Sequence, residues 1–487
     1  SPLSGLAAVM ATEQGERWGG LIDLDPAATP GDAALALAQA LPGAAPGTLA
    51  LRGAQGFEPR LRRAPWAPEA PPRWRPDASY LITGGLGGIG QPIAQRLVAQ
   101  GARHLVVLSR TPLPARAAWA GLGADTPAGR AVAAVRGLES LGASVRHVAL
   151  DVADEAALRD WLEGFAAEAH PPIRGVFHAA GLTDDQLVRD LDAASLAAVL
   201  RPKLGGAWNL HRLLPELDAF VLFSSMAALM PQAGQASYAA ANAFLDGLAR
   251  HRRALGQPAL SIGWGVWSQT GVMRGETGQR QQDELQRQGI GAFAPAQALA
   301  LFDEALRWPH GHLLAMPIDW ARLRAQGGAR QAALLRDLFA SEAAPAQQGA
   351  ASDAPAPAEP ADPAERRRAL ELTVREVVGR VLKLNPARID PRKPLGSLGL
   401  TSLMALELRN RLEPLHGQPL SATLAWNYPT IEALTGFLAG AHATAPVPSA
   451  APVAAPDAGP APDIATVLDG VNQLSDEDAA LLLRRRR

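Results

Sequence analysis

The chain has 487 residues, of which 48% are hydrophobic and 19% are charged, and its formal net charge is −1 at pH 7. The chain therefore lacks the excess of basic residues that is typical of nucleic-acid-binding proteins. Its length predicts about three domains. The chain contains no cysteine, so any thiol must come from an added group, and we predict no metal site. Because it lacks a long apolar run and a signal peptide, we expect a cytoplasmic protein with no membrane partner.

Three proline-rich stretches divide the chain. The first is a short joint over 64–76, and the other two are Ala/Pro-rich segments over 343–363 and 441–462. Such segments bury little apolar surface and stay extended, so we interpret them as linkers. The predicted domains are therefore 1–64, 77–342 and 364–440, followed by a tail over 463–487.

The region 77–342 alternates short apolar runs with helical patterns. Continuous apolar runs between amphipathic helices are typical of a parallel sheet that is covered on both faces. We therefore predict an α/β fold with a doubly wound, Rossmann-type sheet, whose ligands bind at the carboxyl ends of the strands. The expected strands are 79–83, 104–109, 145–150, 175–178, 219–224 and 259–264, and the expected helices are 89–100, 131–141, 155–167, 193–214 and 238–255.

A glycine-rich loop follows the first expected strand and opens a helix. The stretch 83–90 reads Thr-Gly-Gly-Leu-Gly-Gly-Ile-Gly. Glycines let the backbone turn tightly and approach a pyrophosphate, which then sits at the helix N-terminus. A purely structural turn is the alternative, and the strand–turn–helix context disfavours it. The predicted dinucleotide-binding residues of this loop are Thr83, Gly84, Gly85, Leu86, Gly88, Ile89 and Gly90.

The second expected strand ends at Ser109, which Arg110 follows. An acidic residue at this point would accept hydrogen bonds from the ribose of NAD, whereas an arginine suits the 2′-phosphate of NADP. The sequence therefore favours NADPH, with a solvated surface arginine as the alternative for Arg110. His178 is interpreted as a packed histidine without a catalytic role. The predicted cofactor contacts are completed by Asp151 and Val152 near the adenine, and by Ala179, Ala180 and Gly181 near the nicotinamide ribose.

A candidate reducing centre follows the fifth strand. Ser225 lies next to the end of this strand, Tyr238 begins a helix, and Asn242 lies one turn further on the same helix face. Hydride delivery to a ketone needs a proton donor at the developing alkoxide and a second donor that polarises the carbonyl. A phenol can supply the proton if a cation lowers its pKa, and Lys203 is the candidate cation. A core aromatic is the alternative for Tyr238, but its small neighbours at 239–241 favour an open cleft.

These motifs together resemble the ketoreductases of modular polyketide synthases, a branch of the short-chain dehydrogenase/reductase family. Ordinary short-chain enzymes have lysine where this chain has Asn242, and an upstream Lys203 marks the polyketide and fatty-acid synthase branch. The resemblance implies that Tyr238 is the proton donor and that Ser225 orients the carbonyl. It also implies that Lys203 tunes the tyrosine and that Asn242 supports a proton relay. The matching stretches are 83–90, 178–181, 202–203, 223–225, 238–246 and 263–267.

The resemblance extends to the stereochemistry of reduction. Asp184 and Asp185 lie where B-type ketoreductases carry Leu-Asp-Asp, although Thr183 replaces the leucine. The tryptophan of A-type enzymes is absent, and Met230 stands in its place. We therefore predict B-type reduction, which gives a D-configured β-hydroxyl. A solvated acidic loop is the alternative for the two aspartates.

Residues 1–64 resemble the C-terminal half of the structural subdomain that precedes such catalytic domains. Because the first half is missing, we expect a piece of a longer chain. Synthases that also reduce the double bond have an enoylreductase between the two subdomains. Only the short joint over 64–76 occupies this place, so no enoylreductase is expected there.

The region 364–440 has helical periodicity at 364–382, 402–412 and 430–439, which predicts a small all-α bundle. Ser402 opens the second helix, where a serine commonly acts as N-cap and where a phosphodiester is electrostatically favoured. The stretches 395–412 and 426–430 resemble acyl carrier proteins of the same synthases. This resemblance implies that a phosphopantetheinyl transferase attaches 4′-phosphopantetheine to Ser402, although Thr401 replaces the usual preceding aspartate.

The sequence thus predicts the ketoreductase–acyl carrier portion of a polyketide synthase, which reduces a carrier-bound β-ketoacyl thioester with NADPH. Upstream ketosynthase and acyltransferase domains are the implied partners. The tail over 463–487 predicts short amphipathic helices that dock on a downstream synthase subunit, with a disordered end as the alternative. Two rival functions are a non-reducing scaffold and a free-standing reductase of small ketones. The complete motif set argues against the first, and the attached carrier argues against the second.

Overall fold

The computed structural model describes residues 1–40, 47–53, 55–64, 73–268, 275–326, 333–342, 363–382, 384–398, 400, 404–405, 408–409, 411–413, 420 and 424–440. Ser402, residues 343–362 and 441–462 of the predicted linkers and the tail over 463–487 lie outside these residues. None of the described helices has the length and apolar character that crossing a membrane requires.

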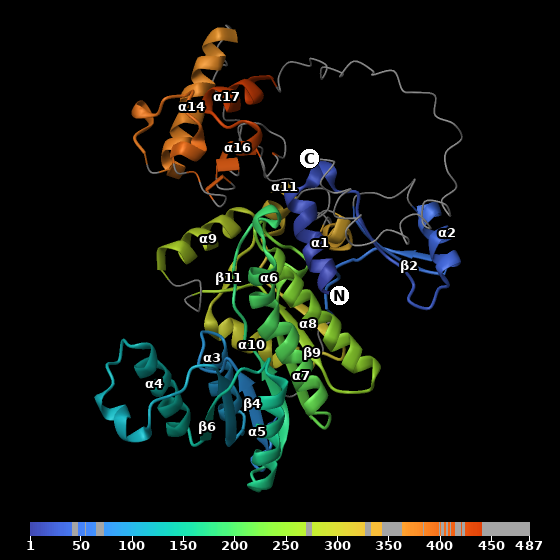
Figure 1. Cartoon of the computed structure of the whole chain (residues 1–487), viewed down its shortest axis with the longest axis vertical. Helices are drawn as coiled ribbons and strands as arrows, with labels where there is room; N and C mark the ends of the chain where they lie inside the picture. The colour runs from blue at the N-terminus through green and yellow to red at the C-terminus, as the bar shows by residue number, and fades with distance from the viewer. Residues whose placement is uncertain are drawn as a thin grey trace, which may run out of the picture. The chain divides into compact units, whose positions relative to one another are not determined.

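Seven parallel strands form one sheet in the middle of the chain (Figure 1). Their order is β12-β9-β8-β7-β4-β5-β6, so the chain winds outward from β4 in both directions. This doubly wound arrangement confirms the predicted fold class and places the switch point between β4 and β7. The strands are β4 (Ser79–Thr83), β5 (His104–Ser109), β6 (Ser144–Ala149), β7 (Ile173–His178), β8 (Ala219–Ser225), β9 (Leu260–Trp264) and β12 (His312–Ala315).

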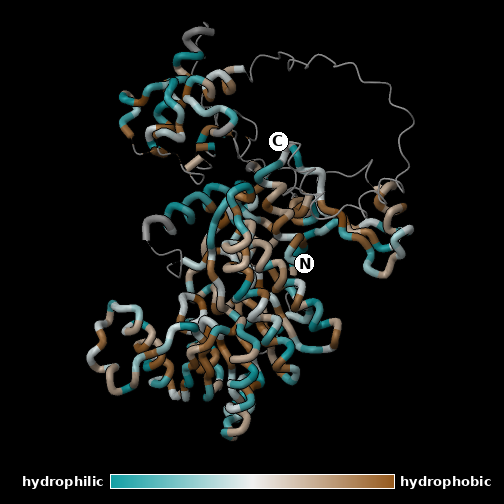
Figure 2. The backbone as a smooth tube through the Cα atoms, in the orientation of Figure 1, coloured by the Kyte–Doolittle hydropathy of each residue, from teal (hydrophilic) through white to brown (hydrophobic). Residues whose placement is uncertain are grey.

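Helices cover both faces of the sheet because strand side chains alternate between the faces. Tyr80 and Ile82 of β4 belong to one buried cluster with Leu97, whereas Leu81 belongs to a second cluster with Leu210 and Leu245. Many of the hydrophobic, brown segments of the tube in Figure 2 lie where Figure 1 draws the strands of this sheet. Helices α3 (Gly90–Ala99), α4 (Pro127–Ser140) and α10 (Pro295–Ala305) contribute to the first cluster, and α5 (Glu155–Ala167), α7 (Gly206–Leu213) and α8 (Ala236–Ala254) contribute to the second.

Local chemistry accounts for several helix boundaries. The Asp154 side chain accepts a hydrogen bond from the N–H of Ala157 at 3.1 Å at the start of α5. The helix expected over 193–214 is confirmed as one continuous helical stretch from Ala193 to Leu213, in which a π-helical turn, Arg201–Gly205, joins α6 (Ala193–Leu200) to α7. Pro202 has no N–H to continue the α-helical hydrogen bonds. The strand β12 was not predicted from the sequence.

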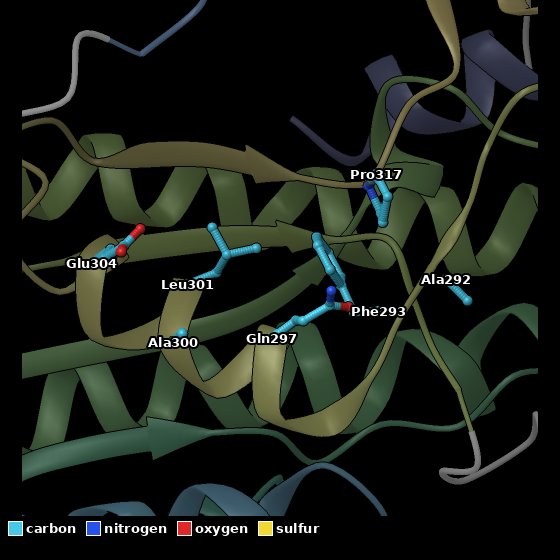
Figure 3. A pocket seen from close by; sticks show the side chains of 7 residues that line it. All are labelled: Ala292, Phe293, Gln297, Ala300, Leu301, Glu304 and Pro317. Carbon is cyan, nitrogen blue, oxygen red and sulfur yellow. The ribbon is translucent and has the colours of Figure 1, made fainter.

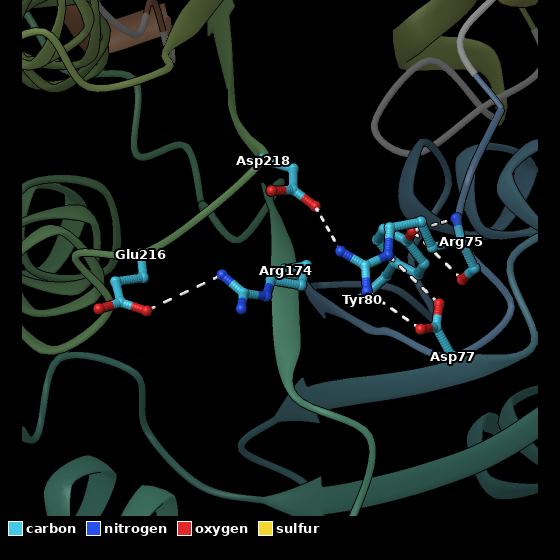
Figure 4. Close-up of polar contacts among 6 residues, drawn as sticks. All are labelled: Arg75, Asp77, Tyr80, Arg174, Glu216 and Asp218. Atoms are coloured by element: carbon cyan, nitrogen blue, oxygen red, sulfur yellow. Dashed lines mark hydrogen bonds and ion pairs between the residues drawn. The ribbon is translucent and has the colours of Figure 1, made fainter.

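Polar contacts tie the joint before β4 to the amino end of the sheet (Figure 4). The Tyr80 hydroxyl accepts from the N–H of Arg75 at 2.6 Å and donates to the carbonyl of the same residue at 3.3 Å. The Arg75 guanidinium also pairs with Asp77 at 3.0 Å and approaches Asp218 at 3.9 Å. These contacts fix where the chain enters β4, and therefore where the glycine loop begins.

The N-terminal segment combines a long helix with a small sheet. Helix α1 (Pro2–Glu13) packs along α8, and Val9 shares a buried cluster with Ala236 and Ala239. A Cβ added at Gly5 would collide with the carbonyl of Ala239, so the two helix backbones are in close contact. The three-stranded sheet consists of β1 (Leu21–Asp23), β2 (Thr48–Arg52) and β3 (Gln55–Phe57), with α2 (Pro30–Ala40) between β1 and β2.

The described part of the predicted carrier region is helical. Val374, Val377, Val378 and Val381 of α14 are buried at the spacing of one helix face. Within the helix expected over 402–412, the described residues 404–405, 408–409 and 411–412 are helical, and so is residue 413. The elements are α14 (Pro363–Leu382), α16 (Leu424–Asn427) and α17 (Ile431–Gly440), with 3-10 turns at Pro386–Arg388 and Leu395–Leu398.

Two glycine-to-alanine substitutions are expected to change stability in opposite directions. Gly5→Ala should lower the free energy of unfolding by about 1–3 kcal/mol, because the methyl group overpacks the α1–α8 contact. Gly164→Ala in α5 should raise it by about 0.5–1 kcal/mol, because helix interiors favour alanine and the new Cβ meets no atom within 4 Å. Urea unfolding measures both, and a stabilising Gly5→Ala would contradict the close helix contact.

Candidate active site

The predicted reductase residues gather at the carboxyl ends of the central strands. Thr83 ends β4, Ser109 ends β5, His178 ends β7 and Ser225 ends β8. In a parallel sheet these ends lie on the same edge, beside the switch point. The structure therefore brings together residues that are far apart in the sequence.

The glycine loop after β4 has room only for glycine at its key positions. Gly84 has a φ of +67°, and a Cβ added there would lie 3.1 Å from the backbone of Ala179. A Cβ added at Gly90 would collide with the carbonyl of Gly84. The loop closes with a hydrogen bond from the N–H of Gly87 to the carbonyl of Gly84 at 2.9 Å. This tight turn at the N-terminus of α3 fits a pyrophosphate.

A buried polar network joins the ends of β4 and β7. The Thr83 hydroxyl accepts from the N–H of Ala180 at 3.1 Å, and the same oxygen is hydrogen-bonded to Nδ1 of His178 at 2.8 Å. Burial, with the charge of Lys203, lowers the pKa of His178 to about 3. His178 is therefore neutral and packed, in agreement with the interpretation from sequence.

The predicted contacts to the adenosine end lie on β5 and after β6. Ser109 Oγ lies 2.7 Å from Nε2 of His147 and donates to the carbonyl of Thr111 at 3.1 Å. Arg110 is exposed beside it. The Asp151 carboxylate accepts from the N–H of Ala153 at 3.0 Å and pairs with Arg201 at 3.1 Å.

His147 and Arg201 were missed by the sequence analysis, because their positions depend on strand register and on the π-helical turn. Val152 is buried, and its carbonyl accepts from the side chain of Asn209 at 3.1 Å.

Lys203 and Tyr238 approach each other from different helices. Lys203 lies in the π-helical turn and is buried, and its Nζ donates to the carbonyl of Phe223 at 2.8 Å. The same Nζ is 5.8 Å from the ring centroid of Tyr238. A Cβ added at Gly181 would lie 2.7 Å from Cε of Lys203, so the glycine leaves space for the lysine. A π-helical turn often marks a functional site.

Ser225 and Asn242 complete the group around Tyr238. The Ser225 hydroxyl accepts from the N–H of Ala227 at 3.2 Å and is close enough to the Tyr238 phenol to act on its pKa. The Asn242 side-chain N–H donates to the carbonyl of Tyr238 at 2.8 Å. Its Oδ1 is buried and has no hydrogen-bond partner within the described part of the chain.

Burial controls the protonation of this group. It raises the pKa of Tyr238, while hydrogen bonds to Ser225 and Asn242 act in the opposite direction. It lowers the pKa of Lys203 to about 8, against the attraction of Asp246. The phenol is therefore protonated at neutral pH and can donate, and most of the lysine remains cationic.

The predicted stereochemistry motif lies on a loop beside Tyr238. The carbonyl of Asp184 accepts from the Ser237 hydroxyl at 3.3 Å, and its carboxylate accepts from the Gln186 side chain at 3.0 Å. Desolvation and the charge of Asp184 raise the pKa of Asp185. The nearby charge of Asp185 in turn contributes to the raised pKa of Tyr238.

A separate groove of about 510 Å³ lies between β11 (Ala292–Phe293) and α10 (Figure 3). It contains none of the predicted site residues. Its lining residues are Ala292, Phe293, Gln297, Ala300, Leu301, Glu304 and Pro317.

Comparison with known proteins agrees with this geometry. The family described as KR domain matches residues 78–269, and the family described as phosphopantetheine attachment site matches residues 373–438. A structure titled as A-type ketoreductases from modular polyketide synthase is 39% identical, with a TM-score of 0.60 over 70% of each chain. PlmKR1, a ketoreductase of phoslactomycin biosynthesis in Streptomyces sp. HK803, is 35% identical, with a TM-score of 0.59 over 69% of this chain and 74% of that one.

The chain belongs to the polyketide synthase ketoreductases. It is an oxidoreductase with a β-ketoreductase domain and a carrier domain, as predicted. Domains of these two kinds use NADPH and carry 4′-phosphopantetheine, which are the two predicted cofactors. The spectinabilin polyketide synthase system protein NorA′ of Streptomyces orinoci is 39% identical over 83% of this ketoreductase chain. The mycoketide-CoA synthase of Mycobacterium tuberculosis is 39% identical over 74% of it. The chain spans only 11% and 8% of the length of these relatives.

The neutral state of His178 predicts a specific sensitivity of this ketoreductase to acid. Its pKa is about 3 in the folded state, against an ordinary histidine value of 6.5, so the unfolded chain binds the proton more tightly. Stability should therefore fall as the pH decreases below about 6.5. His178→Asn, whose side-chain amide can hydrogen-bond to Thr83 in place of Nδ1, should reduce this dependence.

Urea unfolding at pH 7.5 and at pH 5 measures the difference between wild type and variant. Replacing the exposed His310 by asparagine is the matched control and should leave the wild-type pH dependence unchanged. The same pH dependence in all three proteins would contradict a buried neutral His178.

Proposed function

We propose that this chain reduces the β-keto group of an acyl thioester on its own carrier domain to a β-hydroxyl, with NADPH as the reductant. The proposal rests on two features that lie at the same edge of the sheet. One is the glycine-only turn at Gly84 and Gly90, and the other is the Ser225–Tyr238 pair. The carrier family match in the same chain supports a tethered substrate.

The residues along the sheet edge fit the successive parts of NADPH. The glycine loop would hold the pyrophosphate, and Ser109 with Arg110 would hold the 2′-phosphate. Asp151 and Val152 would border the adenine, and the backbone of 179–181 would border the nicotinamide ribose. When bound, NADPH supplies the hydride that forms the new C–H bond at the β-carbon.

The chain itself supplies the proton and the orientation. Tyr238 gives its phenolic proton to the β-carbonyl oxygen, and Ser225 donates a hydrogen bond that polarises the same carbonyl. The raised pKa of Tyr238 keeps this proton in place before the reaction. Lys203 stabilises the resulting phenolate by its charge. The free Oδ1 of Asn242 is positioned to hold a water that returns the proton.

We infer B-type reduction with a D-configured hydroxyl. The retained pair Asp184 and Asp185 lies on the loop beside Tyr238, which supports a role in substrate orientation. Met230, where A-type enzymes have tryptophan, is buried in an apolar cluster with Val266 and Leu323.

The carrier must reach the reductase, and the stretch 343–363 would act as its tether. A flexible tether raises the local concentration of the bound substrate. A phosphopantetheinyl transferase would modify Ser402, and upstream ketosynthase and acyltransferase domains would supply the β-ketoacyl group. The tail over 463–487 would dock on a downstream synthase subunit.

Reduction of a loaded carrier tests the proposal. The chain is modified at Ser402 by a phosphopantetheinyl transferase, loaded with a β-ketoacyl group and mixed with NADPH. We expect NADPH oxidation and a gain of two hydrogens in the bound acyl group by mass spectrometry. Tyr238→Phe should slow this reaction by about 10²–10⁴-fold, because the proton donor is lost.

Two variants separate the roles of the two domains. Tyr80→Phe is the matched control, because Tyr80 bonds to Arg75 at the amino end of the sheet, and it should retain reduction. Ser402→Ala should not accept the phosphopantetheine arm, so its mass should stay unchanged after the transferase reaction. A loaded wild-type carrier without NADPH oxidation would contradict the reductase and favour the scaffold. An L-configured product would refute the B-type assignment but not the reductase function.

Arg110 provides a test of cofactor choice. Arg110→Gln should weaken NADPH binding by about 10- to 100-fold, because a charge-assisted hydrogen bond to the 2′-phosphate is lost. NADH binding should change little, since NADH lacks this phosphate. Fluorescence titration of both nucleotides measures the effect, with the exposed Arg130→Gln on α4 as control. If Arg110→Gln lost the same affinity for NADPH and for NADH, a contact between Arg110 and the 2′-phosphate would be excluded.

A further inference from the structure

A buried carboxylate from the N-terminal helix connects two distant loops. Glu13 is the last residue of α1, and only 3% of its surface is exposed. Its Oε2 accepts from the N–H of Val188 at 2.8 Å, and its Oε1 accepts from the N–H of Gly234 at 2.8 Å. These partners are 175 and 221 residues away along the chain. One side chain thus bonds to two loops at once.

Both loops border the predicted reducing centre. The first, over 181–190, carries Asp184 and Asp185. The second, over 226–235, runs from Ser225 to the helix of Tyr238. The loops bond to each other through the N–H of Gln186 and the carbonyl of Gly234 at 2.8 Å. The first loop bonds to Ser237, next to Tyr238, and the second bonds to Ser225, so both adjoin the residues that would act on a substrate.

The base of this connection is rigid. Helix α1 contacts α8 at backbone distance where Gly5 meets Ala239, directly after Tyr238. Val9 packs with Ala239, and the partly buried Val188 of the first loop lies against the same cluster. Glu13 therefore extends from an element that is fixed to the helix of the proton donor.

The two hydrogen bonds from Val188 and Gly234 to the Glu13 carboxylate, here called the clamp, are of a strong kind. Hydrogen bonds from N–H groups to a carboxylate are shorter and stronger than neutral ones. If the carboxylate were removed, two backbone N–H groups in a poorly solvated place would lose their acceptors. Burial raises the pKa of Glu13, and the bonds from Gly234 and Val188 oppose this shift because they favour the charged form.

We propose that Glu13 is a positioning residue that holds the two loops at a set separation and thereby controls which face of the β-keto group is reduced. The stereochemical part rests on the proposed reduction, and the clamp itself does not. The N-terminal segment would then act on the outcome of the reaction through the loops, without touching the substrate.

Glu13→Gln tests the clamp while keeping the side-chain shape, because its amide group would face a backbone N–H with another donor. We expect hydrogen–deuterium exchange to rise about tenfold in both loops, the factor that corresponds to about 1.4 kcal/mol. The share of the minor hydroxyl configuration should rise by a similar factor. Binding of NADPH, measured by fluorescence, should stay within about twofold, a change of about 0.4 kcal/mol.

The matched control is Asp303→Asn. Asp303 is also buried, at 5% exposure, and bonds to Arg96 and Gln100 on the opposite face of the sheet from α8. Asp303→Asn should lower the melting temperature, but it should not change the hydrogen–deuterium exchange of either loop or the ratio of the two hydroxyl configurations. Glu13→Asp, which keeps the charge on a shorter side chain, should give a smaller change in the same direction, and it replaces Glu13→Gln if that variant does not fold.

Exchange in both loops that equals wild type in Glu13→Gln would overturn the clamp. Faster exchange with an unchanged product ratio would overturn the control of stereochemistry. A wild-type chain that does not reduce a loaded β-ketoacyl group would contradict the proposed function, and the exchange measurement would still decide the clamp.

Discussion

The register of the parallel sheet is the constraint on which the reductase site depends. Thr83 and His178 are register partners on β4 and β7 although they are 95 residues apart. The hydrogen bond between their side chains fixes the two strand ends to each other. Because the glycine loop starts directly after Thr83, the same contact places Gly84 against the backbone of Ala179. A slip of one residue would send alternate side chains to the wrong face and separate these groups.

Burial then sets the charge state of the site. It keeps His178 neutral and Tyr238 protonated, and it lowers the pKa of Lys203 to about 8. These shifts share one cause, since an apolar surrounding disfavours the charged form of any group. The outcome differs by residue type: the phenol keeps the proton that a reduction needs, while the lysine still carries charge at neutral pH. The fold thus prepares a proton donor and a nearby cation.

The N-terminal segment contributes more to this site than its place in the sequence suggests. By sequence it resembles a structural subdomain that is separated from the catalytic region by a proline-rich joint. In the structure, α1 lies in backbone contact with α8, and Glu13 satisfies the N–H groups of Val188 and Gly234. A buried backbone N–H without a partner is costly, and an acceptor from another segment of the chain removes that cost here.

Local patterns were sufficient for what depends on neighbours in the sequence. The apolar runs predicted six strands, the loop from Thr83 to Gly90 predicted the cofactor turn, and the spacing of Tyr238 and Asn242 predicted one helix face. The edge strand β12 was not predicted because it is short and three of its four residues are only partly buried. The π-helical turn was not predicted because periodicity does not resolve a single wide turn. Contacts such as Ser109–His147, Asp151–Arg201 and Glu13–Val188 join residues 38, 50 and 175 positions apart. Sequence alone determined the residue types and the local elements, whereas only the tertiary structure decided these partners, because strand register and helix packing bring them together.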